Sequence, residues 1–182
     1  MNTVLETVRR LLELHRSGKL GGETMPEDEN PGLKRNSALN YMYFTLPISL
    51  NYQRNSYMLW KCANNMFKTH PEVFDSKSVC AMDEDLLREI LVSHKVALQP
   101  NKQPEIWKKL CQTIEGHLDG DIRNLFRWND YSVGKIKDHI AAHKKDFPYL
   151  GGTKICNYWL YVMEQYNTIE ASTWNYGYKH IH

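Results

Sequence analysis

Residues 144–163 read KKDFPYLGGTKICNYWLYVM, and this stretch carries most of the information about the fold. Its first residues are polar and end one helix, a Phe-Pro-Tyr-Leu-Gly-Gly turn follows, and a strongly apolar helix begins at about Lys154. Two consecutive glycines, Gly151 and Gly152, permit a tight turn and the close approach of another backbone. The sequence here therefore predicts two helices joined by a compact turn.

Helical periodicity extends over the rest of the chain. Apolar residues recur at helical spacing, and no segment shows the sustained alternation that indicates a β-strand. Ser37, Asp83 and Ser132 stand where each would cap a helix. We predict an all-α multi-helix bundle with about eight helices, over residues 3–16, 37–47, 56–68, 84–94, 104–117, 121–126, 132–144 and 154–165.

The length predicts a single domain. The chain has 182 residues, which is within the usual size of one domain. We divide it into an N-terminal helix (1–20), a turn-rich acidic loop (21–35), a helical core (36–165) and a tail (166–182). The hydrophobic fraction of 42% and the charged fraction of 24% are those of an ordinary globular protein.

Composition also excludes several functional classes. The net charge of +2 is too small to indicate nucleic-acid binding by itself. No apolar run is long enough to cross a membrane and no secretory signal is visible, so we expect a cytoplasmic (nucleoid) or nuclear protein that is not secreted. The four cysteines form no Cys-x-x-Cys pair, so we expect no metal site, and without a visible signal peptide we expect reduced thiols.

The turn at residues 147–153 is a candidate anion site. Backbone N–H groups at the start of the second helix have no intrahelical partner and can hold a phosphate. Lys144, Lys145 and Lys154 surround the turn, which favours a clamp on the DNA backbone. An ordinary helix connection with solvated lysines explains the same residues, and both interpretations stay open.

Three segments resemble the helix-hairpin-helix DNA glycosylases, in the endonuclease III-like branch. FPYLGGTK (147–154) is similar to the family's hairpin, whose pattern is close to Leu-Pro-Gly-Val-Gly-x-Lys, with Tyr149 at the first glycine and Thr153 as an extra residue. SLNYQRNSYMLWKCANNMF (49–67) resembles the family's Ser-x-Gln helix region, and KVALQPNKQPEIWKKLC (95–111) resembles its Gly-Leu-x-Asn-x-Lys segment. The resemblance implies a helix-hairpin-helix motif near residues 135–165.

The resemblance also implies a function and a set of site residues. It implies excision of a damaged base from duplex DNA by cleavage of the N-glycosidic bond, with a Schiff-base lyase step in bifunctional members. Lys154 matches the lysine nucleophile, Gln53 the glutamine at the gap left by the flipped base, and Leu98 the apolar wedge. A phosphate-binding role for the lysine is the alternative. Residues expected to hold the DNA backbone are Lys144, Lys145, Tyr149, Leu150, Gly151, Gly152 and Thr153.

The catalytic carboxylate departs from the family pattern. The family aspartate lies about 18 residues after the lysine, but position 172 is Ser172 and the nearest acid is Glu170. Three explanations stay open: a truncated or frame-altered chain, a member that only binds, or Glu170 in place of the aspartate. A chain lacking the family's last helices would expose an apolar groove, and a homodimer is one way to bury it. Cys156 is the last cysteine, so we expect no iron–sulfur cluster and no other cofactor.

The sequence also contains candidates for other functions and other sites. A non-catalytic α-helical module that binds DNA or protein and a nucleoside hydrolase on the same scaffold are the alternative functions. His139 and His143 are four residues apart and could share a metal, but a solvated pair is favoured. The remaining expectations are core packing for the aromatic residues Tyr158, Trp159 and Tyr161, and a solvated loop for the acids Glu23, Glu27, Asp28 and Glu29.

Overall fold

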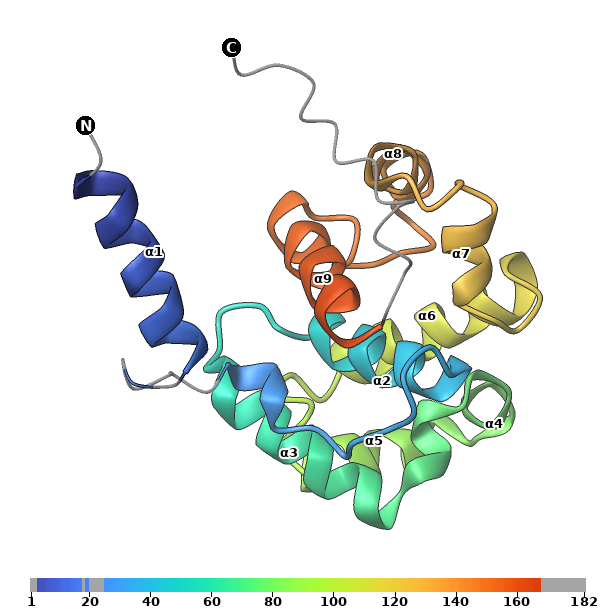
Figure 1. The fold of residues 1–182 in the computed structure, drawn as a ribbon. Coiled ribbons are helices and arrows are strands. Elements are labelled where there is room, and N and C mark those ends of the chain that lie inside the picture. Colours follow the sequence, from blue (N-terminus) through green and yellow to red (C-terminus); the bar gives the residue numbers. More distant parts are fainter. Residues whose placement is uncertain (1–2, 18, 20–24, 168–182) are drawn as a thin grey trace.

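The computed structural model describes residues 3–17, 19 and 25–167, and this part of the chain contains only helices and turns. The all-α prediction is confirmed: nine α-helices and two short 3-10 helices form a multi-helix bundle over the described residues (Figure 1). Their bounds are α1 (Thr3–Arg16), η1 (Pro26–Asp28), α2 (Ala38–Ser49), α3 (Ser56–Thr69), η2 (Pro71–Phe74), α4 (Ser76–Ala81), α5 (Glu84–Ser93), α6 (Gln103–His117), α7 (Arg123–Arg127), α8 (Val133–Ala142) and α9 (Thr153–Tyr166).

Helix α2 is the centre of the fold. Ten of its residues, from Asn40 to Ser49, are buried. It packs against α9 and α6 and also contacts α3 and η2. Trp159 of α9 is fully buried, and its indole N–H donates to the Thr45 hydroxyl over 3.0 Å. Because α2 is covered on all sides, it needs no polar face, which explains why its sequence lacks amphipathic periodicity.

An aromatic cluster joins α2 to the helices after it. The Tyr43 ring stacks on Phe74 with centroids 5.2 Å apart, and Phe74 meets Trp107 edge-on at 5.4 Å. The Trp107 indole donates to the Val73 carbonyl oxygen over 2.8 Å. Stacked and edge-on contacts between large buried rings hold neighbouring elements in one relative position.

Most helix starts follow the sequence prediction. The side chains of Ser37, Asp83 and Ser132 accept hydrogen bonds from the first-turn N–H groups of α2, α5 and α8, so these three caps are confirmed. The six-residue helix α4 was not predicted. It is capped by Asp75 but is too short to show helical periodicity.

Helix α1 is confirmed as a helix, but its apolar side is not packed. Figure 1 shows α1 standing apart from the remaining helices. Leu14 on this apolar side is partly buried, whereas five other apolar residues are 46–76% exposed, namely Val4, Leu5, Val8, Leu11 and Leu12. Across the described ranges, no helix is both long and apolar enough to span a membrane.

Candidate functional site

A cavity of about 630 Å³ lies between the α8–α9 turn and the loop that follows α2. We call it the hairpin cavity. Residues 51–53 and the start of α9 form parts of its wall. Seven residues predicted for the site line it: Gln53, Lys144, Tyr149, Gly151, Gly152, Thr153 and Lys154. Its wall also includes Asn51, Tyr52, Phe147 and Ile155, which the sequence analysis did not assign to the site.

The turn itself is tightly closed. Tyr149 has a left-handed backbone with a φ of 60°, at the position where the resembled hairpin has a glycine. A Cβ atom on Gly151 would lie 3.2 Å from the Phe147 carbonyl oxygen, and one on Gly152 would lie 3.2 Å from the Tyr149 carbonyl oxygen. Both glycines therefore stand where a side chain would crowd the turn.

The N–H groups of the turn donate hydrogen bonds within the turn itself. Leu150 N donates to Pro148 O over 2.7 Å, Gly151 N to Phe147 O over 2.8 Å, and Gly152 N to Tyr149 O over 2.9 Å. These three N–H groups therefore have partners within the turn, and the groups expected to hold a phosphate are those at the start of the following helix. Helix α9 begins after Gly152 without a capping side chain, so its first-turn N–H groups are the ones oriented for an anion.

Three of the predicted backbone-binding residues differ in their placement. The Leu150 side chain is fully buried in the core, so it stabilises the turn and offers no surface for DNA. Lys144 is exposed and lines the hairpin cavity, because its side chain lies against Gly151. Lys145 is exposed and is not in the cavity wall.

Side-chain contacts connect the loop carrying Gln53 to the loop carrying Leu98. The Arg54 guanidinium donates to the carbonyl oxygens of Val96 over 2.5 Å and of Lys95 over 2.9 Å. This one side chain therefore ties together the two segments predicted to act at the DNA gap.

An aromatic pair joins the first of these loops to the turn. The rings of Tyr52 and Tyr149 are stacked with centroids 5.7 Å apart and planes at 16°. The Lys102 ammonium lies 5.1 Å from the Tyr149 ring centroid, and a hydrogen bond to Tyr149 raises the pKa of Lys102. Tyr52 and Lys102 lie within the two segments that resemble the family, but the resemblance assigns a role only to Gln53 and Leu98 there.

Leu98 is an exposed apolar side chain on a fixed backbone. It is 57% exposed, whereas Val96 and Ala97 before it are buried. The side-chain oxygen of Gln103, which is 4% exposed, accepts from Leu98 N over 2.5 Å and from Gln99 N over 3.1 Å. The loop therefore presents Leu98 to solvent without being free to collapse.

Lys154 lies at the wall shared by two cavities. It is exposed in the first turn of α9, and this placement is open to both roles expected of it, nucleophile and phosphate ligand. The second cavity, of about 410 Å³, shares Asn51, Gln53, Lys154 and Ile155 with the first. We call it the Glu27 cavity, because Glu27, Arg54, Tyr158 and Tyr161 contribute to its wall.

The acidic loop is not solvated at Glu27, which corrects the sequence-based expectation. Glu27 is 1% exposed. Its carboxylate accepts from the Tyr158 hydroxyl over 2.8 Å, and that hydroxyl accepts from the Trp60 indole N–H over 3.1 Å. Burial raises the pKa of Tyr158, and this phenol therefore stays protonated as a donor.

The expected catalytic carboxylate and the histidine pair contribute no further site. Glu170 and Ser172 lie outside the described residues. The rings of His139 and His143 are 4.6 Å apart, and burial together with His143 lowers the pKa of His139. Among the described residues, no group of three His, Cys, Asp or Glu side chains is arranged to hold a metal.

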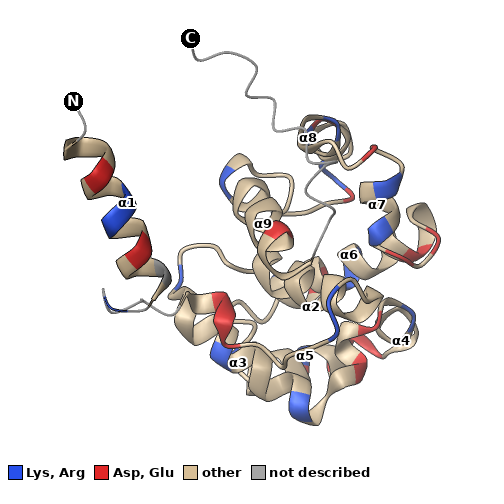
Figure 2. Cartoon of the chain, in the orientation of Figure 1, with Lys and Arg blue, Asp and Glu red and all other residues tan. Residues whose placement is uncertain are grey.

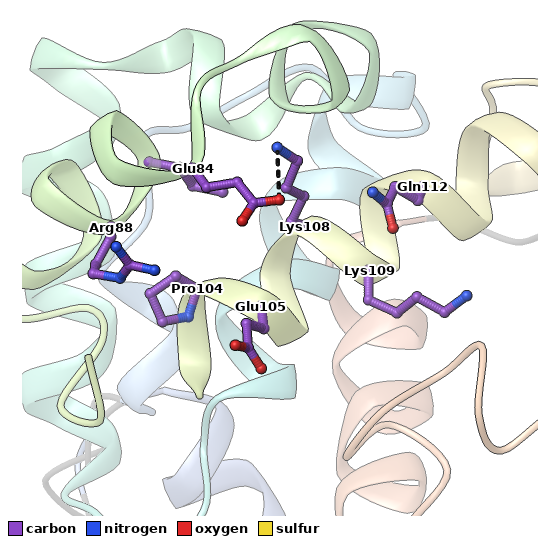
Figure 3. A pocket seen from close by; sticks show the side chains of 8 residues that line it. Glu84, Arg88, Pro104, Glu105, Lys108, Lys109 and Gln112 are labelled. Carbon is purple, nitrogen blue, oxygen red and sulfur yellow. Dashed lines mark ion pairs between the residues drawn. The ribbon is translucent and has the colours of Figure 1, made fainter. Parts of the chain in front are cut away.

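A third hollow between α5 and α6 is a salt-bridged surface feature. It measures about 180 Å³, and the Lys108 ammonium in its wall lies 3.5 Å from the Glu84 carboxylate (Figure 3). It contains none of the predicted site residues. Figure 2 shows basic and acidic positions interspersed along the ribbon, so charge alone does not mark a binding face.

Comparisons with protein-family models, with curated proteins and with solved structures gave no match. The function must therefore be inferred from the geometry of the site.

Proposed function

We propose that this protein is a DNA glycosylase-like protein that binds duplex DNA at a damaged base and excises that base. The observation that carries the proposal is the meeting of Gln53, Lys154 and the turn at residues 149–153 around one cavity. These residues come from segments about 100 positions apart in the sequence, and the resemblance implies a role at the DNA for each of them.

The backbone of the turn supports the same function. Tyr149 occupies the place of a family glycine and has the left-handed φ that a glycine would favour. A turn that keeps this conformation despite a bulky side chain retains the hairpin geometry. Leu98, tied to the Gln53 loop through Arg54, is suited to fill the space that a flipped base leaves in the stack.

The chemistry assigned to Lys154 is nucleophilic. Its neutral amine would attack C1′ of the deoxyribose, and the electrons of the C1′–N bond would leave with the base, which takes up a proton. Loss of a proton from the lysine nitrogen and opening of the sugar ring would then give a Schiff base. Lys154 is exposed without DNA, so its amine is accessible to a bound strand. Glu170 remains the candidate carboxylate.

Borohydride trapping tests the proposal. Duplex oligonucleotides carrying an abasic site or one oxidised, deaminated or alkylated base would be incubated with the protein and borohydride, which reduces a Schiff base to a stable amine. We expect a covalent adduct with the wild type and none with Lys154→Ala. Lys77→Ala is the matched control, because Lys77 is an exposed helical lysine on α4, outside both cavities.

DNA affinity separates the remaining outcomes. Binding without an adduct, with an affinity that falls as salt rises, would favour the non-catalytic DNA-binding alternative. In that case Lys144→Ala should lower the salt slope by about one unit, as expected for the loss of one phosphate contact. Absence of both adduct and DNA binding would refute the proposal.

A further inference from the structure

The Glu27 cavity differs in chemistry from the hairpin cavity beside it. Both cavities have two tyrosines in their walls, but only the Glu27 cavity also has a carboxylate and a guanidinium, from Glu27 and Arg54. Such a combination of flat apolar surface and a few fixed polar groups is typical of a small-molecule pocket. The volume of about 410 Å³ is within the range of such pockets and can hold a purine.

The carboxylate in this wall is held in place. Glu27 is 1% exposed, and a relay from the Trp60 indole through the Tyr158 hydroxyl ends on its oxygen. The backbone is also fixed, because the Asn30 side-chain amide donates to the Glu27 carbonyl oxygen over 2.9 Å. The Glu27 side-chain oxygen accepts the hydrogen bond of the Tyr158 hydroxyl, and an accepting carboxylate favours a ligand edge that presents N–H groups.

The wall of the Glu27 cavity also contains a hydrogen-bond donor. Arg54 lines the same cavity, and its Nε atom is buried without a hydrogen-bond partner among the described residues. An N–H group in that state favours a carbonyl oxygen on the ligand. Tyr158 and Tyr161 lie three residues apart on α9 and supply aromatic surface for a planar ring.

We infer that the Glu27 cavity binds a guanine-type base and that the Glu27 carboxylate distinguishes it from other bases. Guanine presents a ring N–H and an exocyclic amino group next to each other, beside one carbonyl oxygen. Hypoxanthine lacks the amino group, and uracil and thymine place carbonyl oxygens on both sides of their ring N–H. The inference rests on the proposed function, because it treats this cavity as the pocket for the base released beside Lys154.

Guanosine and inosine form a matched pair of probes, since they differ by the one amino group. Binding would be followed by titration in two-dimensional NMR, using the indole N–H signals. The chain has five tryptophans, and Trp60→Phe would identify the Trp60 signal. Because the Trp60 indole donates into the relay that ends on Glu27, its signal should shift when the cavity is occupied.

We expect the wild type to bind guanosine roughly tenfold to a hundredfold more tightly than inosine, the difference due to one hydrogen bond to a charged group. Glu27→Gln should lose this preference, because the amide replaces one acceptor with a donor. Glu29→Gln is the matched control: Glu29 accepts from Asn64 over 2.8 Å and is not in the cavity wall.

Three results would overturn the inference: equal affinity for the two nucleosides, no binding of either at millimolar concentration, or an unchanged preference in Glu27→Gln. The comparison of nucleosides on the wild type needs no variant, so it decides the matter even if Glu27→Gln does not fold. A failure of this inference can also be told apart from a failure of the proposed function. A guanosine preference without a trapped adduct refutes only the lyase, and an adduct without a preference refutes only the role of Glu27.

Discussion

The left-handed backbone of Tyr149 allows the hairpin geometry to be tested by stability alone. We compare Tyr149→Gly with Tyr149→Ala, since both remove the ring, its stacking on Tyr52 and its contact with Lys102. With a φ of 60°, an alanine should bear about 1–2 kcal/mol of strain that a glycine avoids. Glycine loses about 0.5–1 kcal/mol more in backbone entropy on folding. Taken at the middle of each range, the difference leaves Tyr149→Gly more stable than Tyr149→Ala by about 0.8 kcal/mol.

Urea unfolding at equilibrium, followed by circular dichroism, measures this difference. Tyr161 is the control position, because it is a partly exposed tyrosine within α9. There the order should reverse, with the glycine variant less stable than the alanine variant by about 1 kcal/mol. A Tyr149→Ala protein as stable as Tyr149→Gly, or more stable, would refute the left-handed turn and with it the support that the turn gives to the proposed function.

Two further predictions concern the loop of Leu98 and the core. Gln103→Leu removes the acceptor for the N–H groups of Leu98 and Gln99. It should lower the free energy of unfolding by about 1–3 kcal/mol and speed amide hydrogen exchange at both residues. Unchanged exchange would contradict the role of Gln103. Burial raises the pKa of Tyr41 to about 12, above its ordinary 10.0, so its contribution to stability is complete below pH 10 and is lost as pH rises towards 12. Between pH 9 and pH 11, the free energy of unfolding of Tyr41→Phe should therefore fall by about 1 kcal/mol less than that of the wild type, as measured by urea titration. An identical fall in the two proteins would disprove this.

Local signals in the sequence were sufficient for much of the fold. Ser37, Asp83 and Ser132 each cap a helix through a hydrogen bond to a residue two or three positions further on. Such contacts depend on neighbours in the chain and are therefore readable from a single sequence. The same holds for α9, whose apolar run and preceding glycines predicted a helix after a turn.

The environment of Glu27 could not be predicted, because it depends on residues far along the chain. Glu27, Asp28 and Glu29 form a run of acids that usually lies in solvent. In the fold, each accepts a hydrogen bond from a distant side chain, and the donors are Tyr158, Tyr166 and Asn64 respectively. These partners lie on α9 and α3, so only the packing of those helices turns a solvated run into a buried carboxylate.

The strained residues of the backbone argue for the same site without any appeal to resemblance. Seven residues other than glycine have a positive φ, among the residues that the structure describes. Three of them are Asn or Asp, which tolerate this conformation well. Of the other four, Gln53, Lys95 and Tyr149 lie in the two loops and the turn around Lys154, and only Tyr131 lies elsewhere. Strain of this kind persists where the surrounding structure fixes the backbone, and it clusters at functional sites. Arg54 holds the Lys95 carbonyl and the Tyr52–Tyr149 stack joins the Gln53 loop to the turn, so the two residues that flank Gln53 contact the other two strained segments.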